Sequence, residues 1–413
     1  MPNDERQNTK GGQWQTLQGA QAVGQPSVYG PPSIVYIGRG ESIEQQIVHR
    51  ESDLPFLPLP AVALRGRGPL GALRGLATLL GGVRAARRML TELRPGAILG
   101  TGGYVCVPLF LAARTMGVPT LIYLPDVVPG LAVRLLARIA TLVACNVEDS
   151  ASYLGLASDD RRLKVTGYPV RAGLFGQDKA ACRQAFNLND ELPVLLVYGG
   201  SLGARSINRA VEALLPQLLN RCQVIHICGR EGDETWLQAA AARLSPELRT
   251  RYKLFPYLES GSQGAKEPRS QGGGDRAKHE SDTDSRSPAL PISASMMTAF
   301  GAADLAVCRS GASTLAELPA AGLPAVLVPY PHVHQDENAD YLVKRGAALK
   351  VADGALLAGS NPGGGALFPA VIRLLDNQHE RQRMAERSRS LARPAAARQL
   401  AEALCGLATR SLS

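Results

Sequence analysis

Several features that would mark particular protein classes are scarce or missing in this 413-residue chain. Aromatic residues make up only 5% of it, which disfavours binding of single-stranded nucleic acid by base stacking. It has no uncharged apolar run of about 18 residues, so we expect no transmembrane helix. Its polar N-terminus lacks the apolar core of a secretory signal. Its seven cysteines include no CxxC pair, which favours buried, reduced thiols in a cytosolic protein over a zinc site or disulfides.

The composition is that of a large folded protein with a basic balance. Hydrophobic residues reach 45%, too many for a disordered chain, and the length is sufficient for two or three domains. The net charge of +9 suits nucleic acid, an anionic membrane surface or a phosphorylated substrate. Together with the shortage of aromatic residues, it leads us to expect an anionic partner but no nucleic acid.

Short apolar strands alternate with helical stretches in two series, from Ile34 to Val147 and from Val194 to Val351. Such alternation predicts βαβ units and parallel sheets, hence an α/β fold with two Rossmann-like domains. The expected parts are a disordered or unmatched tail 1–33, a first domain 34–166, a hinge 167–176, a second domain 177–390 and a C-terminal helix 391–413.

One segment interrupts the second series. Residues Glu259–Pro291 number 33 and include Leu290 as their one large aliphatic residue. A segment so poor in apolar surface cannot offset its ordering entropy, so we predict a disordered insertion in the second domain at 259–291. A simple loop extension is favoured over a phosphoregulated segment or a partner-binding tail.

Glycine-rich and small-residue loops stand where strands lead into helices. Gly199–Gly203 follows an apolar strand and opens a helix, as in phosphate-binding turns, although tight packing alone could also require its glycines. Its spacing differs from the dinucleotide fingerprint, which disfavours NAD. At Arg309–Glu317, the Glu317 carboxylate could accept hydrogen bonds from a ribose diol. Alternatively, Ser313 caps the helix and Glu317 is merely exposed.

Three further polar segments complete the pattern. Thr101–Tyr104 follows a strand of the first series and could cradle a phosphate. Arg171 lies in the hinge and could pair with a diphosphate. Pro329–Asn338 gathers polar side chains at another strand end, where ligands bind in open parallel sheets. His332 and His334 have no third pre-organised ligand near them in sequence, so we expect no metal site there.

As a set, these motifs resemble the MurG-type N-acetylglucosaminyltransferases of peptidoglycan synthesis, in glycosyltransferase family 28. The resemblance covers roughly residues 34–405 outside the insertion and implies the GT-B architecture, two Rossmann-like domains with parallel sheets facing a cleft. The motifs in family order are GGYV 102–105, PGL 129–131, YPVR 168–171, GGSLGAR 199–205, RSGASTLAE 309–317, AAGLPAVLVPYPH 320–332 and HQDENA 334–339.

The resemblance implies an inverting transfer of N-acetylglucosamine from UDP-N-acetylglucosamine to undecaprenyl-pyrophosphoryl-N-acetylmuramoyl-pentapeptide, with no cofactor and no metal. The donor diphosphate would be held by the Gly199–Gly203 loop and Arg171, the nucleotide by residues 312–314, and the ribose by Glu317. The residues implied for donor binding are Arg171, Gly199, Gly200, Ser201, Gly203, Ala312, Ser313, Thr314, Glu317, His334, Gln335 and Asn338.

The acceptor half departs from the family pattern. The family begins with a strand and a Gly-rich loop whose His is the favoured base. Residues 1–33 contain no such loop, so either the true start lies upstream or the element is lost, and we expect slow transfer or none. Asp126 is the candidate replacement base, or it merely caps a turn. The implied acceptor-binding residues are Thr101, Gly102, Gly103 and Tyr104.

A basic amphipathic stretch runs from Leu64 to Arg94, with a long helix expected from about Pro69 to Leu93. Its pattern is typical of a helix on anionic lipid, although a core-packed helix with a solvated arginine face would also fit. With the lipid-linked acceptor, it implies a peripheral protein on the cytoplasmic face of the inner membrane. The predicted membrane contacts are Arg65, Arg67, Leu73, Arg74, Leu76, Leu79 and Leu80.

Two other functions remain open from the sequence. A truncated, inactive homologue would bind the UDP-sugar without turnover. A related GT-B enzyme would act on another lipid acceptor, or epimerise a UDP-sugar.

Overall fold

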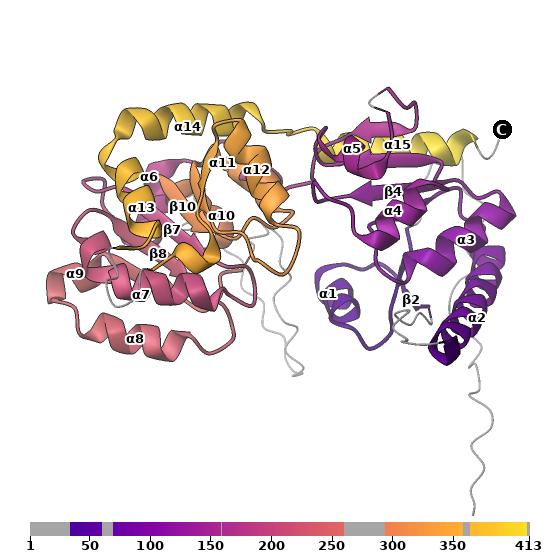
Figure 1. The fold of residues 1–413 in the computed structure, drawn as a ribbon, viewed down its shortest axis with the longest axis horizontal. Coiled ribbons are helices and arrows are strands. Elements are labelled where there is room, and N and C mark those ends of the chain that lie inside the picture. Colours follow the sequence, from indigo (N-terminus) through magenta and orange to yellow (C-terminus); the bar gives the residue numbers. More distant parts are fainter. Residues whose placement is uncertain (1–33, 60–68, 158, 260–293, 358–363, 411–413) are drawn as a thin grey trace, which may run out of the picture. The chain divides into compact units, whose positions relative to one another are not determined.

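The computed structural model describes residues 34–59, 69–157, 159–259, 294–357 and 364–410. The chain divides into two compact units, 1–94 and 95–413. The described strands pair only in parallel, which confirms the α/β class with parallel sheets (Figure 1). Within the described ranges, none of the helices has the length and apolarity needed to cross a membrane.

The described part of the first unit holds two short strands and two helices. Strands β1 (Tyr36–Gly38) and β2 (Phe56–Pro58) pair in parallel, and α1 (Ile43–Glu51) connects them. The hydroxyl of Ser42 accepts a hydrogen bond from the Gln45 amide and so caps the start of α1. The basic stretch forms one long helix, α2 (Pro69–Leu93), with the bounds expected from the sequence.

A four-stranded sheet opens the second unit, in the order β3-β4-β5-β6. All five residues of β4 are buried, as expected for a parallel strand covered on both faces. The last helix, α15 (Ala396–Arg410), packs on this sheet through Leu400 and Leu407 against Leu121 and Tyr123 (Figure 1). The strands are β3 (Ile98–Gly100), β4 (Thr120–Leu124), β5 (Leu142–Cys145) and β6 (Leu163–Val165).

A six-stranded sheet follows, in the order β12-β11-β10-β7-β8-β9. The chain begins this sheet at its centre with β7, continues outward through β8 and β9, and then crosses back to place β10 on the other side of β7. The direction of progress therefore reverses between β7 and β10, which makes that edge a topological switch point. The strands are β7 (Val194–Tyr198), β8 (Gln223–Ile227), β9 (Tyr252–Phe255), β10 (Leu305–Cys308), β11 (Ala325–Leu327) and β12 (Ala348–Lys350).

Side chains of this sheet enter two hydrophobic clusters by alternation along each strand. On β7, Leu195 and Val197 belong to the cluster that includes α7 and α13, whereas Val194 and Leu196 belong to the cluster of α10 and α11. The helices of this unit are α3 (Cys106–Met116), α4 (Leu131–Ala137), α5 (Ser150–Leu154), α6 (Lys179–Ala185), α7 (Arg205–Leu219), α8 (Glu234–Ala242), α9 (Pro246–Thr250), α10 (Met296–Ala302), α11 (Thr314–Ala321), α12 (Asp336–Lys344), α13 (Leu367–Asp376), α14 (Gln378–Ser390) and α15.

Two stretches of chain connect the four-stranded sheet with the six-stranded one, and they touch. Gly167 has φ +83°, and a Cβ placed there would lie 2.7 Å from Cδ of Arg393 and 3.1 Å from Cβ of Ala396. Only glycine combines this backbone conformation with so close a contact. The outgoing and the returning connection are thus packed together at Gly167.

The cysteines are free thiols, of which five are buried, Cys106 is half-buried and Cys405 is exposed on α15. The predicted insertion lies outside the described residues except for Glu259. The carbonyl oxygen of Glu259 accepts a hydrogen bond of 2.8 Å from the amide of Met296, so residues on the two sides of the insertion are hydrogen-bonded to each other.

Replacing residues 260–290 with a short Gly-Ser linker should leave the melting temperature and the donor affinity nearly unchanged. The segment contributes almost no apolar surface, and the hydrogen bond between Glu259 and Met296 remains. Thermal unfolding followed by circular dichroism, with calorimetry of UDP binding, tests this. A large fall in melting temperature would show that the segment packs on the fold.

Candidate active site

Polar loops gather at the carboxyl ends of three adjacent strands, β7, β10 and β11. Residues 199–203 follow β7, residues 309–313 follow β10, and residues 329–335 follow β11. Because these strands are parallel neighbours at the switch point, their loops open at the same edge of the sheet, where ligands bind in such folds. The structure therefore brings together the three donor motifs that were predicted separately.

The loop after β7 is shaped by close backbone packing. Gly203 has φ +90°, and a Cβ there would lie 2.1 Å from the carbonyl oxygen of Cys228. Ser201 is exposed, and α7 begins at Arg205 directly after the loop. The loop thus packs closely against the backbone of Cys228. Ser201 and the backbone amides at the start of α7 lie where they could bind an anion.

A buried polar chain supports this loop from the interior, and sequence reasoning missed it. His226 is fully buried, with Nδ1 2.8 Å from the Tyr252 hydroxyl and Nε2 3.0 Å from Oδ1 of Asn208. Asn208 Nδ2 donates to the Cys228 carbonyl and to Asp233, and Asp233 also accepts from Nε of Arg205. Burial lowers the pKa of His226 to about 3, so the imidazole stays neutral in this chain.

The loop after β10 leads into α11, which carries Glu317 in its first turn. Ser313 is the N-cap residue, but its side chain makes no capping bond. Burial raises the pKa of Glu317, while a hydrogen bond from Ser313 and the charge of Arg171 lower it in part. Glu317 is half-buried and close enough to Arg171 to be affected by its charge. The alternative of a merely exposed carboxylate is therefore wrong.

Arg309 is bound entirely within the protein and connects three segments. Its guanidinium pairs with Asp353, donates to the Ser206 hydroxyl at 2.8 Å, and donates to the carbonyl of Val328 at 3.1 Å. It also lies over the Tyr330 ring, 5.3 Å from the ring centre. The arginine that opens this motif thus fixes the start of α7 and the end of β11 relative to β10. Its charged partners are too distant in sequence to have been predicted.

The segment after β11 enters α12 and divides into exposed and buried side chains. The side chain of His334 is 68% exposed, and its Nδ1 lies 3.8 Å from Oε1 of Glu337. The amide oxygen of Gln335 accepts from the Tyr330 backbone, and its carbonyl accepts from the Ser310 hydroxyl. His334 and Gln335 are therefore placed at the open edge of the site.

Asn338 differs from His334 and Gln335 because none of its surface is exposed. Its Oδ1 accepts from the backbone amide of Val127 at 2.9 Å, and its Nδ2 donates to Asp126 Oδ1 at 2.8 Å and to the Ser310 carbonyl at 3.0 Å. Asn338 therefore links the donor edge of the six-stranded sheet to the loop that follows β4.

Asp126 is half-buried on that loop, and Oδ1 accepts the bond from Asn338. Burial raises the pKa of the Asp126 carboxyl, while Asn338 and the charge of His334 lower it in part. The N-cap of α4 is Gly130, whereas the Asp126 side chain contacts Asn338 of a predicted donor motif and so lies at the candidate site.

The predicted acceptor loop follows β3. Gly102 and Gly103 have φ +102° and +81°, and a Cβ on Gly102 would lie 2.8 Å from a methyl of Val133 on α4. Thr101 and Tyr104 are exposed. The left-handed glycines let the backbone turn tightly beside α4 at the end of a strand.

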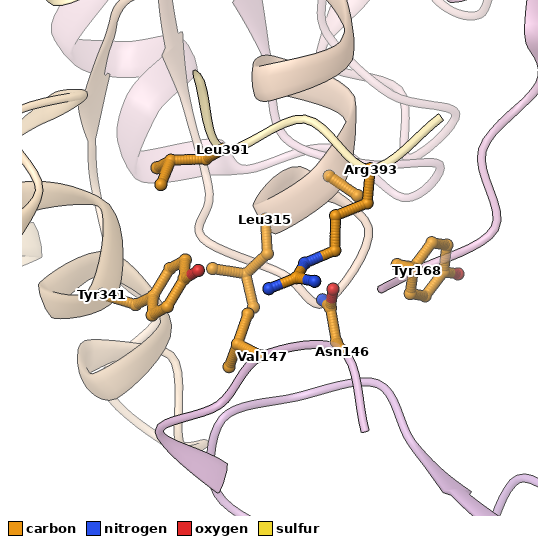
Figure 2. A pocket seen from close by; sticks show the side chains of 8 residues that line it. Asn146, Val147, Tyr168, Leu315, Tyr341, Leu391 and Arg393 are labelled. Atoms are coloured by element: carbon orange, nitrogen blue, oxygen red, sulfur yellow. The ribbon is translucent and has the colours of Figure 1, made fainter. Parts of the chain in front are cut away.

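Figure 2 shows a small pocket in this unit, with the Arg393 side chain extending between Asn146 and Leu315. None of the predicted donor-binding residues lines it. The lining residues are Asn146, Val147, Tyr168, Leu315, Ala316, Tyr341, Leu391 and Arg393.

The candidate site includes two histidines of the segment after β11, His332 and His334. In the ranges that the structure describes, no group of three or more His, Cys, Asp and Glu side chains is arranged to hold a metal ion. His332 and His334 are exposed near the start of α12 and belong to no such group.

Comparison with known proteins identifies the family. Residues 29–145 match the glycosyltransferase family 28 N-terminal domain, and residues 194–267 and 270–400 match its C-terminal domain. This match, together with the two parallel sheets and the shared fold of a solved family member, makes the chain a glycosyltransferase of the GT-B type. The chain belongs to glycosyltransferase family 28, and it is a hexosyltransferase by that membership.

Curated relatives and solved structures agree with this assignment. A Roseiflexus protein is 55% identical over 383 residues, covering 89% of this chain and 82% of its own, and an Ectopseudomonas mendocina protein is 36% identical over 77% and 76%. Both are named UDP-N-acetylglucosamine–N-acetylmuramyl-(pentapeptide) pyrophosphoryl-undecaprenol N-acetylglucosamine transferase. The crystal structure of Acinetobacter baumannii MurG shares the fold with a TM-score of 0.63 at 23% identity, covering 90% of both chains.

Substituting Glu317→Gln should raise the melting temperature at neutral pH while weakening UDP-N-acetylglucosamine binding. Burial raises the pKa of this carboxyl in the folded state, so ionised Glu317 costs stability above that pKa. The gain should shrink in acidic buffer, where the wild-type carboxyl is already protonated. Donor affinity should fall about tenfold with the loss of a charge-assisted acceptor.

Thermal unfolding at two pH values and calorimetric titration measure both effects. The exposed Glu402→Gln is the matched control and should change neither. Unchanged donor affinity in Glu317→Gln would remove Glu317 from ribose binding.

Proposed function

We propose that this chain transfers N-acetylglucosamine from UDP-N-acetylglucosamine to undecaprenyl-pyrophosphoryl-N-acetylmuramoyl-pentapeptide, converting lipid I to lipid II in peptidoglycan synthesis. The observation that carries the proposal is the convergence of three donor motifs at the switch point between β7 and β10. The curated names of relatives at up to 55% identity support the choice of both substrates.

The donor half supplies anion binding and charge stabilisation. The Gly199–Gly203 loop and the start of α7 hold the diphosphate, and the exposed Arg171 supplies a cation. Residues 312–314 line the nucleotide pocket, Glu317 accepts from the ribose, and His334 and Gln335 face the sugar. Helix N-termini and the arginine stabilise the charge that develops on the leaving UDP.

The acceptor half offers one phosphate loop and one carboxylate. The amides of Thr101–Tyr104 hold the acceptor pyrophosphate at the end of β3. Asp126 removes the proton from the attacking hydroxyl as the bond to the anomeric carbon forms and UDP leaves. Its Oδ1 is held by Asn338, and a raised pKa makes a carboxylate a stronger base for this step.

The lipid-linked acceptor requires access to a membrane surface, and α2 provides a suitable face. Leu76 and Leu80 are 53% and 60% exposed, one turn apart, and Arg84, Arg87 and Arg88 are exposed further along the helix. Its C-terminal half also has a buried face, at Ala86 and Leu90. We assign the exposed leucines to peripheral contact with the anionic cytoplasmic leaflet. Of the other predicted contacts, Leu79 is half-buried, Arg65 and Arg67 lie outside the described residues, and the side chains of Leu73 and Arg74 are not described.

Substituting Asp126→Asn should lower kcat by about 10²- to 10⁴-fold, because the base is lost. The donor KM should change little, since the Asn side chain can still accept from Asn338. Wild-type kcat should fall as pH drops through the raised pKa of Asp126, and this fall should vanish in the variant. Radiolabelled sugar transfer to a lipid-linked muramoyl acceptor measures both.

The exposed Asp159→Asn is the matched control for this substitution and should keep full activity. Full activity in Asp126→Asn would exclude Asp126 as the base. UDP binding without any transfer by the wild-type chain would instead favour the inactive UDP-sugar-binding alternative.

Exchanging Leu76 and Leu80 for serine should weaken binding to vesicles that contain anionic phosphatidylglycerol by about tenfold or more, because two exposed apolar side chains no longer enter the lipid. Ile43→Ser on α1, which is 75% exposed, is the control. Co-sedimentation at low and high salt measures the effect. Equal binding of the double variant and the wild type would assign the membrane contact elsewhere.

A further inference from the structure

Helix α12 is attached at both ends to loops of the four-stranded sheet. Near its start, Asn338 binds Asp126 and Val127 in the loop after β4. At its end, Arg345 binds Glu148 and Asp149 in the loop after β5. Since the first attachment holds the proposed base, the second determines how firmly that contact is kept.

The second attachment is a compact ion-pair cluster. Arg345 Nη2 lies 2.8 Å from Oε1 of Glu148 and 2.7 Å from Oδ1 of Asp149, and Nη1 lies 3.4 Å from Oδ2 of Asp149. The guanidinium also covers the Tyr341 ring at 3.7 Å. Arg393, on the returning connection, pairs with the other oxygen of Glu148 at 3.2 Å.

The arginine of this cluster is less exposed than one in an ordinary surface ion pair. Only 25% of the Arg345 side chain is exposed, because Tyr341 lies beneath it and the two carboxylates lie beside it. A planar guanidinium can contact two carboxylates and an aromatic ring at once, which a lysine ammonium cannot do in the same geometry.

The two attachments are spaced to act on one rigid element. Asn338 and Arg345 are seven residues apart, which is about two helical turns and about 10 Å along the axis, so they lie on one face of the helix. Gly346 follows with φ +68°, and a Cβ there would lie 2.2 Å from a guanidinium nitrogen of Arg387, so the chain turns away directly after Arg345. A helix of this length transmits a displacement at one end to the other.

We propose that Arg345 is a positioning residue for the transfer reaction: by clasping Glu148 and Asp149, it keeps α12 seated so that Asn338 holds the Asp126 carboxylate in line with the donor. This role rests on the proposed function, because it assigns importance to the alignment of Asp126. Arg345 itself need not touch either substrate.

The test is a charge exchange with two readouts. Arg345→Asp should lower kcat about tenfold while leaving the Kd of UDP unchanged, since a small misalignment of the base slows the chemistry and the diphosphate loop is untouched. The double variant Arg345→Asp with Asp149→Arg should recover most of the lost kcat. Arg345→Lys should fall between the wild type and Arg345→Asp.

The second readout does not depend on activity. Hydrogen exchange of the α12 amides should accelerate in Arg345→Asp and return toward wild type in the charge-exchanged double variant. The control is Arg221→Asp, which breaks a similarly close pair with Asp376, 2.8 Å long and roughly half exposed on both sides. It should change neither kcat nor the exchange of α12.

Unchanged α12 exchange and unchanged kcat in Arg345→Asp would overturn the clasp. So would an equal loss in both variants, because a structural defect would not be rescued by reversing the charges. If the wild type itself transfers no sugar, the proposed function fails, whereas the exchange data still decide whether Arg345 seats α12.

Discussion

The buried carboxamide of Asn338 is the interaction on which the site depends. It makes three hydrogen bonds to groups from the β4 loop and the β10 loop and exposes no surface to water. If one partner moved away, a buried polar atom of Asn338 would lose its hydrogen bond, at a cost in stability. The two loops must therefore stay at a fixed separation. This constraint also fixes the position of the Asp126 carboxylate and of the start of α12.

Much of the fold was predictable because its signals are local. Buried parallel strands such as β4 and β7 read as continuous apolar runs, and their bounds were predicted from the sequence. The donor loops were found for the same reason: glycine is required at Gly203 by the nearby Cys228 carbonyl, and that requirement is visible as a motif. Proline at the end of β2 and lysine in the middle of β6 disfavour a strand there, and both elements were missed.

The polar contacts were not predictable, because their partners lie far apart in the chain. Asn338 was expected to face the sugar, yet its amide binds Asp126, more than 200 positions earlier. Arg309 was read as part of a ligand motif, although Asp353 and Ser206 occupy it. Sequence identifies which side chains are polar and near a strand end, whereas packing decides whether each binds a ligand or another residue.

The return of α15 to the four-stranded sheet has a consequence for synthesis. Leu400 and Leu407 cover Leu121 and Tyr123, so the four-stranded sheet is completed by a helix that is synthesised long after its own strands. The six-stranded sheet, which needs only residues already made, can form before that cover arrives. During translation the four-stranded sheet therefore has an uncovered apolar face until α15 is made. A nascent chain stalled before residue 396 would expose that face to chaperones or to aggregation.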